Sequence, residues 1–256
     1  MMSKESVPYK GLCTEYYELD KPDVPEDALQ CYLKYAQEAG GPILEPMCGT
    51  GRFLIPLQER GHSVTGFDYS PHMLAVCRRK CLDKGLRASL IEASFETFAL
   101  GETYGLIFIP SGSFCLLTTW EQAREALKLI ASRLKVGGKF VFEVETLRAI
   151  NQSQGIWRGK WVSRPDGAKI VMSTLSHFDA ASQVETTLCR YELWEKNAIS
   201  CIEVEDFRLK LYEPKEIELL LSEHGFKIMG KWQAEPYSNK EANENASVIL
   251  YECIKL

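Results

Sequence analysis

Two glycines and an aspartate stand where a nucleoside could be bound. Gly49 and Gly51 follow a short apolar segment, and Asp68 ends the next one, seventeen positions after Gly51 (68 − 51). Glycine lets backbone approach a ligand closely, and the first N–H groups of a following helix lack partners. A carboxylate at the end of the second strand can accept hydrogen bonds from both hydroxyls of a ribose. The spacing therefore predicts a nucleoside ligand.

The loop lacks the complete three-glycine pattern of dinucleotide-binding loops, because Leu54 stands at the third glycine position. A pyrophosphate against the helix is therefore disfavoured, and an NAD(P)-dependent oxidoreductase is the less favoured enzyme class. A non-catalytic nucleoside-binding module stays open as an alternative, because a fold alone does not fix a function.

Alternating strands and helices must position these residues. Strands are expected near residues 42–45, 62–68, 88–92, 104–109 and 139–144, and helices near 26–39, 52–59, from Pro71 onward and 120–134. Ser70-Pro71 begins one helix, Thr119 and Gln122 form a possible capping box, and Gly137-Gly138 is expected to end the last helix. This order predicts a doubly wound, mostly parallel sheet behind an N-terminal arm.

The pattern changes beyond Thr146. Residues 157–163, 168–178, 184–194 and 199–211 are rich in strand-forming types without intervening helices, and Asp166-Gly167 and Lys196-Asn197 are hairpin turn signals. A helix from Pro214 and two strands near 226–233 and 246–254 follow, and the strands should pair antiparallel. We expect an α/β protein with a Rossmann-like, doubly wound seven-stranded sheet whose last strand is antiparallel. It would comprise a ligand-binding domain (residues 1–147 and 212–256) and an inserted antiparallel β-lid (residues 148–211).

The chain resembles the class I S-adenosylmethionine-dependent methyltransferases. The resemblance rests on the segments Ile43-Leu44-Glu45-Pro46-Met47-Cys48-Gly49-Thr50-Gly51-Arg52-Phe53 and Gly66-Phe67-Asp68-Tyr69-Ser70-Pro71-His72-Met73-Leu74, with weaker motifs at 92–95 and 106–113. Met47 stands where the family usually has its first glycine. The resemblance implies S-adenosylmethionine as cofactor, S-adenosylhomocysteine as product and, with the lid, a small-molecule acceptor methylated on nitrogen or oxygen.

The same resemblance implies roles for individual residues. Glu45 would organise the loop, Asp68 would hold the ribose, and Arg52 could pair with the methionine carboxylate or stay solvated. Backbone at Met47 and Ile109 would contact the methionine amino end. The implied cofactor-binding set is Tyr17, Glu45, Met47, Gly49, Thr50, Gly51, Arg52, Asp68, Tyr69, Met73, Ser94, Phe95, Ile109 and Pro110.

Catalysis needs no nucleophilic side chain, because a sulfonium is already an activated electrophile that requires alignment and exclusion of water. Glu143 and Glu145 are candidates for orienting or deprotonating an acceptor, with solvated or substrate-holding carboxylates as the alternative. Tyr16 and Tyr17 could close over the sulfonium or pack a helix. Aromatic side chains of the lid could line an acceptor pocket or pack on the sheet: Trp157, Trp161, Phe178, Tyr191 and Trp194.

Charge and cysteine usage narrow the partners. Thirty Lys+Arg against 35 Asp+Glu give a formal charge of −5, so no electrostatic footprint favours nucleic acid. Four dispersed histidines and nine scattered cysteines without a CxxC pair indicate no metal site and a reducing compartment. With neither a targeting segment nor a membrane-length apolar run, we expect a cytoplasmic protein. The acceptor's identity, the atom methylated and the oligomeric state are not encoded in any motif.

Overall fold

The protein is described by a computed structural model covering residues 9–99, 101–234, 236–237 and 240–256. Its helices are α1 (Gly11–Asp20), α2 (Glu26–Glu38), α3 (Leu54–Glu59), α4 (Pro71–Asp83), α5 (Trp120–Arg133) and α6 (Pro214–Glu223), with 3₁₀ turns η1 (Ser113–Leu116) and η2 (Leu147–Ala149). Its strands are β1 (Ile43–Pro46), β2 (Val64–Asp68), β3 (Ser89–Glu92), β4 (Tyr104–Ile109), β5 (Leu134–Glu145), β6 (Arg158–Ser163), β7 (Lys169–Asp179), β8 (Val184–Glu195), β9 (Ala198–Lys210), β10 (Phe226–Gln233) and β11 (Val248–Lys255).

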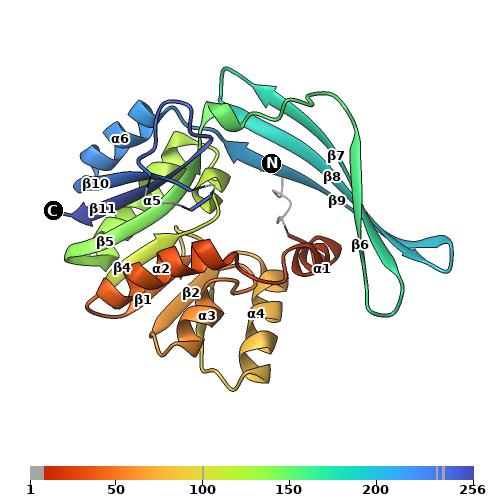
Figure 1. The fold of residues 1–256 in the computed structure, drawn as a ribbon, viewed down its shortest axis with the longest axis horizontal. Helices are drawn as coiled ribbons and strands as arrows, with labels where there is room; N and C mark the ends of the chain where they lie inside the picture. The colour runs from red at the N-terminus through yellow and green to blue at the C-terminus, as the bar shows by residue number, and fades with distance from the viewer. Residues whose placement is uncertain (1–8, 100, 235, 238–239) are drawn as a thin grey trace.

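Seven strands form one mixed sheet in the order β10-β11-β5-β4-β1-β2-β3 (Figure 1). The five strands from β5 to β3 are parallel to one another, whereas β11 pairs antiparallel with both β5 and β10. The strand order reverses between β4 and β1, so the carboxyl ends of these strands flank the position where ligands bind in open α/β sheets. The predicted fold class is confirmed.

Helices bury both faces of this sheet. Helices α2, α3 and α4 share one core with β1, β2 and β4, including Tyr32, Leu54 and Phe108. Helices α5 and α6 share the core of the opposite face, with Phe140 and Phe142 at its centre. Because both faces are covered, polar groups of the sheet are accessible mainly at strand ends.

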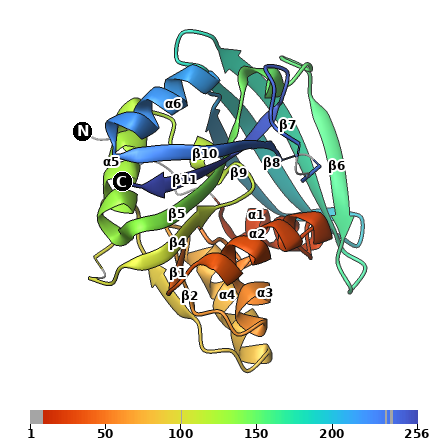
Figure 2. The ribbon, with the colours of Figure 1, turned by 60° about the vertical axis from the view of Figure 1, so that its left-hand side comes forward.

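The remaining four strands form an antiparallel sheet in the order β6-β7-β8-β9, which we call the lid sheet (Figure 2). Its hairpins turn at the predicted places: Lys196 and Asn197 have φ of +48° and +63°, and Gly167 has φ of +88°. Residues with positive φ at both central positions match a two-residue hairpin turn.

Helix α1 lies between the lid sheet and α4 (Figure 1), within a region for which the sequence predicted only an arm. Leu12, Cys13 and Tyr16 of α1 pack with Ile170 and Tyr191 of the lid sheet in a third, separate core. Of the two roles left open for Tyr16, the structure shows the packing one.

One predicted boundary is wrong. Helix α5 ends at Arg133, and β5 begins directly at Leu134, so Gly137 and Gly138 lie inside the strand rather than between helix and strand. Leu134 is buried and pairs with Tyr104, and the register then shifts before Leu106. Gly137, with φ of +73°, provides the irregular backbone that this shift requires.

Candidate active site

The loop from Met47 to Phe53 joins β1 to α3 and turns sharply. Met47, Gly49 and Gly51 all have positive φ, of +56°, +54° and +78°. Methionine therefore occupies at position 47 a left-handed conformation that favours glycine. The Cys48 N–H donates to the Phe67 carbonyl at 3.0 Å, which ties the loop to β2.

The two glycines of the loop have different surroundings. A Cβ placed on Gly51 would lie 2.5 Å from Sγ of Cys77 on α4, whereas one on Gly49 would meet no heavy atom within 4 Å. Gly51 is therefore required for packing as well as for its φ. Gly49 leaves open space beside the loop.

Asp68 connects the ends of β1 and β2. Its Oδ2 accepts a hydrogen bond of 2.8 Å from the N–H of Gly49, and its Oδ1 accepts one of 2.8 Å from the N–H of Ser70. Burial raises the pKa of the carboxyl above its ordinary value, while backbone N–H groups of Ser70, Gly49 and Tyr69 act to lower it. Both oxygens accept backbone hydrogen bonds, and a carboxylate has about four lone-pair sites, so it retains the capacity to accept a further hydrogen bond.

Glu45 of β1 and Thr50 of the loop are both buried. Burial raises the pKa of Glu45 well above its ordinary value, the charge of Asp68 adds to this, and the backbone N–H of Leu54 lowers it. Among the described residues, neither Oε2 of Glu45 nor Oγ1 of Thr50 has a hydrogen-bond partner. Glu45 thus links β1 to the first turn of α3.

The predicted adenine-side residues surround the ends of β2 and β3. Ser70 caps α4 as predicted, since its Oγ accepts from the N–H of Met73 at 3.2 Å. Met73 is buried, while Tyr69 is 57% exposed. The Ala93 N–H donates to the Asp68 carbonyl at 3.0 Å, which brings the following Ser94 and Phe95 to the same edge.

The end of β4 carries Ile109 and Pro110, both buried. Ile109 pairs with Phe142 of β5, so Pro110 and the carboxyl-terminal residues of β5 lie at neighbouring strand ends. Ser111 and Gly112 follow with φ of +56° and +66°, which turns the chain into η1.

The two glutamates of β5 differ in their surroundings. Glu143 is 2% exposed, and its Oε1 accepts hydrogen bonds from the hydroxyls of Tyr32 and Tyr237, the latter at 2.6 Å. The alternative that Glu143 is a solvated carboxylate is therefore wrong, because this side chain lies in the core between α2 and the sheet. Glu145 is half-buried and lines a hollow of about 310 Å³ with Ala149, Ser247 and Val248.

Helix α1 is held from both sides. On the lid side, Glu205 accepts from the N–H groups of Tyr9 and Lys10 at 3.0 and 2.6 Å, and Glu203 accepts from that of Leu12 at 2.7 Å. These carboxylates satisfy N–H groups at the start of α1, where negative charge is stabilising.

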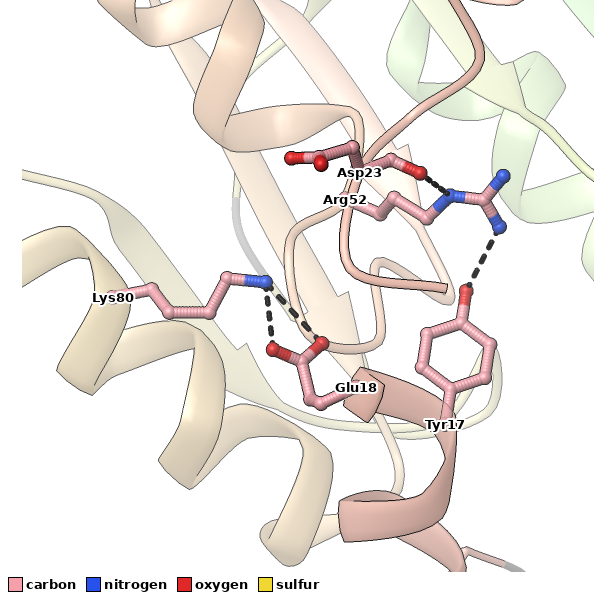
Figure 3. Close-up of polar contacts among 5 residues, drawn as sticks. All are labelled: Tyr17, Glu18, Asp23, Arg52 and Lys80. Atoms are coloured by element: carbon pink, nitrogen blue, oxygen red, sulfur yellow. Dashed lines mark hydrogen bonds and ion pairs between the residues drawn. The ribbon is translucent and has the colours of Figure 1, made fainter. Parts of the chain in front are cut away.

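Figure 3 shows the other side of α1. Nη1 of Arg52 donates to the Tyr17 hydroxyl at 3.4 Å, its Nε donates to the carbonyl of Asp23 at 3.2 Å, and Glu18 pairs with Lys80 of α4 at 3.0 Å. Tyr17 is thus brought to the glycine loop through Arg52.

Tyr9 lies beside the candidate site, and the sequence analysis did not single it out. Its carbonyl accepts a hydrogen bond of 2.9 Å from Oγ of Ser70, and its ring centroid lies 6.1 Å from that of Phe207 in the lid sheet. Burial raises the pKa of its phenol well above its ordinary value, and Cys13, Tyr17, Asp68 and Glu205 raise it further. No motif marks Tyr9, because its position depends on lid residues far along the chain.

Three comparisons identify related proteins. Residues 43–138 match the family model described as a methyltransferase domain. The ubiquinone biosynthesis O-methyltransferase of Xanthomonas axonopodis pv. citri (strain 306) is 25% identical over 218 residues, covering 80% of this chain and 83% of that protein. The chain covers only about half the length of two other curated relatives, 56% and 52%.

Solved structures share the fold. A S-adenosylmethionine-dependent methyltransferase from Clostridium acetobutylicum ATCC 824 matches with a TM-score of 0.79 and 18% identity, over 94% of this chain and 96% of that one. The sugar N-methyltransferase KedS8 from Streptoalloteichus sp ATCC 53650 matches with a TM-score of 0.75 and 17% identity, over 100% and 98%. The likeness includes the lid sheet, since nearly the whole chain is covered.

Proposed function

We propose that this chain, a class I methyltransferase by its fold and by the domain at residues 43–138, transfers a methyl group from S-adenosylmethionine to a nitrogen or oxygen of a small molecule. The observation that carries the proposal is the hydrogen bond between Asp68 and the Gly49 N–H at the strand-order reversal. It joins a carboxylate suited to a ribose to a loop that leaves room for a ligand.

The ribose and adenine would bind beyond β2. The two oxygens of Asp68 would accept the ribose hydroxyls, since the carboxylate has further capacity as an acceptor. Tyr69, mostly exposed, and Met73, buried below it, would pack against adenine. Ser94 and Phe95 would meet the adenine edge.

The methionine end would lie over the loop and β4. Backbone at Met47 and Ile109 would bind its amino group, and Pro110 would adjoin it at the end of β4. Gly49, Thr50 and Gly51 would shape the floor. The guanidinium N–H groups of Arg52 that remain available would pair with the methionine carboxylate, and Tyr17 would cover the sulfonium. The hydrogen bond between Arg52 and Tyr17 supports placing both residues at the methionine end.

Reaction requires an acceptor in line with the donor and without competing water. When bound, S-adenosylmethionine supplies the methyl group as an activated electrophile. Glu145, on the rim of a hollow, would orient the acceptor and take up its proton at a carboxylate oxygen. Glu143 is engaged by two tyrosine hydroxyls, which supports a positioning role for it.

A small-molecule acceptor is supported by similarity to the sugar N-methyltransferase and to the ubiquinone biosynthesis O-methyltransferase. The formal charge of −5 argues against nucleic acid as the acceptor.

All nine cysteines are free thiols, which supports a cytoplasmic location. Among the residues described, no helix is long and apolar enough to span a membrane, and no group of three His, Cys, Asp or Glu could hold a metal ion.

The test is methyl release from S-[methyl-³H]adenosylmethionine incubated with the full chain and a panel of small amines and phenols. We expect label in an acceptor and stoichiometric S-adenosylhomocysteine. Calorimetric binding of S-adenosylhomocysteine is measured in parallel, with reduced nicotinamide cofactors as the comparison. Binding without any turnover would favour the nucleoside-binding module, and binding of nicotinamide cofactor alone would favour the oxidoreductase.

A further inference from the structure

Glu145 ends β5, and three other elements hold its backbone. Its N–H donates to Sγ of Cys115 in η1 at 3.1 Å, and its carbonyl accepts from the N–H of Tyr212 at 3.0 Å. It also pairs with Val248 of β11. These contacts fix the strand end through the backbone, so they do not depend on the carboxylate of Glu145.

The carboxylate of Glu145 lies against the turn that follows β4. A Cβ placed on Gly112 would lie 3.2 Å from Oε1, 3.5 Å from Cγ and 3.8 Å from Cδ of Glu145. The first distance is shorter than the roughly 3.5 Å optimum of a non-bonded contact, so a side chain at position 112 would displace the carboxylate. Glu145 also lines the hollow of about 310 Å³, so a bound molecule can reach this side chain.

The contact with Glu145, rather than the backbone conformation, explains glycine at position 112. Ser111 and Gly112 both have positive φ, of +56° and +66°. Serine at position 111 shows that this turn accepts a side chain in the left-handed region. Glycine at position 112 leaves the space that the carboxylate occupies.

This turn adjoins the position proposed for the methionine end of the cofactor. Ile109 ends β4 and Pro110 follows it, and both residues are buried. Ile109 pairs with Phe142 of β5, so the carboxyl ends of β4 and β5 are neighbours. The carboxylate of Glu145 therefore lies at the edge where we propose that the sulfonium binds.

The methyl donor and its product differ in charge at the sulfur. When a lone pair of the acceptor bonds to the methyl carbon, the carbon–sulfur bonding pair returns to the sulfur, and the sulfonium becomes a neutral thioether. A nearby carboxylate attracts the sulfonium but not the thioether. At an effective dielectric constant of about 20, a charge even about 10 Å away corresponds to roughly a tenfold difference in affinity.

We propose that Gly112 and Glu145 together select the charged methyl donor over the spent cofactor. Gly112 is a positioning residue that lets the carboxylate of Glu145 lie at the end of β4, and this carboxylate favours S-adenosylmethionine over S-adenosylhomocysteine. Loss of the sulfur charge during transfer removes the attraction and so aids release of the product. The inference rests on the proposed function, because it takes the methionine end of the cofactor to lie over β4.

Calorimetry with the full chain and no acceptor tests the inference. The measured quantity is the ratio of the Kd for S-adenosylhomocysteine to the Kd for S-adenosylmethionine. Glu145→Gln should lower this ratio about tenfold by weakening binding of S-adenosylmethionine alone. Salt at about 1 M, where the Debye length is about 3 Å, should lower the ratio of wild type but not that of Glu145→Gln. Glu195→Gln, at the exposed end of β8, is the control.

A second set of variants tests the role of Gly112. Asparagine tolerates positive φ, so Gly112→Asn places a side chain against the carboxylate at little backbone cost and should lower the ratio about threefold. In the Glu145→Gln background, Gly112→Asn should leave the ratio unchanged. Gly85→Asn is the matched control, because Gly85 has φ of +67° and a Cβ there would meet no heavy atom within 4 Å.

Circular dichroism and thermal unfolding establish that each variant is folded. If wild type and Glu145→Gln had the same ratio at low salt, the inference would be overturned while the proposed function stood. If Gly112→Asn lowered the ratio equally with and without Glu145, Gly112 would not act through the carboxylate. A wild type that bound neither ligand would contradict the proposed function as well.

Discussion

The two sheets hold their functional carboxylates by different means. In the seven-stranded sheet, Asp68 lies at a strand end and binds backbone N–H groups 2 and 19 residues away. In the lid sheet, Glu203 and Glu205 lie within β9 and bind the N–H groups of residues 9, 10 and 12, from 191 to 196 residues away. The first arrangement is mostly local and orders the edge where we propose that the cofactor binds, whereas the second is long-range and attaches α1 to the lid sheet.

The largest effect should follow from removing the local carboxylate. Asp68→Ala deletes the acceptor of the Gly49 N–H and the proposed acceptor of two ribose hydroxyls. The loss of two charge-assisted hydrogen bonds should weaken S-adenosylhomocysteine binding by about 2–4 kcal/mol, or roughly 30- to 700-fold. Calorimetry measures it, with Asp83→Ala at the exposed end of α4 as control. Equal affinity of Asp68→Ala and wild type would contradict the assignment of the ribose site.

Two glycine variants separate packing from binding within the local arrangement. Gly51→Ala forces a positive φ on alanine and a contact with Cys77, so the free energy of unfolding should fall by about 2–4 kcal/mol. Gly49→Ala meets open space and should cost only about 1–2 kcal/mol of stability, yet it should weaken cofactor binding. Denaturant unfolding and calorimetry measure both.

Cys77→Ala in the Gly51→Ala background is the control, because it removes the contacted sulfur. Partial recovery of stability is expected. If Gly49→Ala bound S-adenosylhomocysteine as tightly as wild type, the space beside Gly49 would not belong to the cofactor site.

The sequence predicted the local arrangement well because its determinants are short-range. The glycine loop, the Ser70 cap and the Thr119–Gln122 capping box each depend on residues within a few positions, and the structure has all of them. Hairpin turns were predictable for the same reason. Gly137-Gly138 misled the analysis, since glycines can mark a strand irregularity as well as a helix end.

The long-range arrangement could not be predicted in the same way. Helix α1 has no side-chain cap at Lys10, because its capping carboxylates come from β9. The attachment places Tyr9 and Tyr17 beside Ser70 and Arg52, whose hydrogen bonds to them also join residues far apart in the sequence. Likewise, alternation identified the lid strands, but nothing local decided that Trp161 and Trp194 would be exposed while Tyr191 would be buried.

Breaking the long-range arrangement should have a smaller, regional effect. Glu203→Gln and Glu205→Gln each replace charged acceptors of N–H groups with neutral ones, which should cost about 1 kcal/mol each. Hydrogen exchange should accelerate in residues 11–20 while the core of β4 and β5 stays protected. Glu195→Gln, at the exposed end of β8, is the control. Unchanged exchange in α1 would show that its attachment does not depend on these charges.

A pH experiment distinguishes the buried carboxyl beneath the loop from a surface one. The pKa of Glu45 is raised by burial, so the folded state holds its proton above the ordinary glutamate pKa of about 4.3 and stability falls as pH rises from there. Glu45→Gln removes this dependence, and its stability relative to wild type should increase with pH, by at most about 1.4 kcal/mol per pH unit.

Glu38 of α2 should give a pH dependence of stability opposite in sign to that of Glu45. A hydrogen bond from Lys139 lowers the pKa of Glu38, so its contribution is present above the ordinary glutamate pKa and is lost on acidification. Glu38→Gln should therefore lose stability relative to wild type at neutral pH and match it at low pH. Urea unfolding across the pH range measures both variants. Parallel pH profiles for Glu45→Gln and wild type would mean that Glu45 ionises normally in the fold, and its role beneath the loop would then be that of an ordinary charged acceptor for the Leu54 N–H.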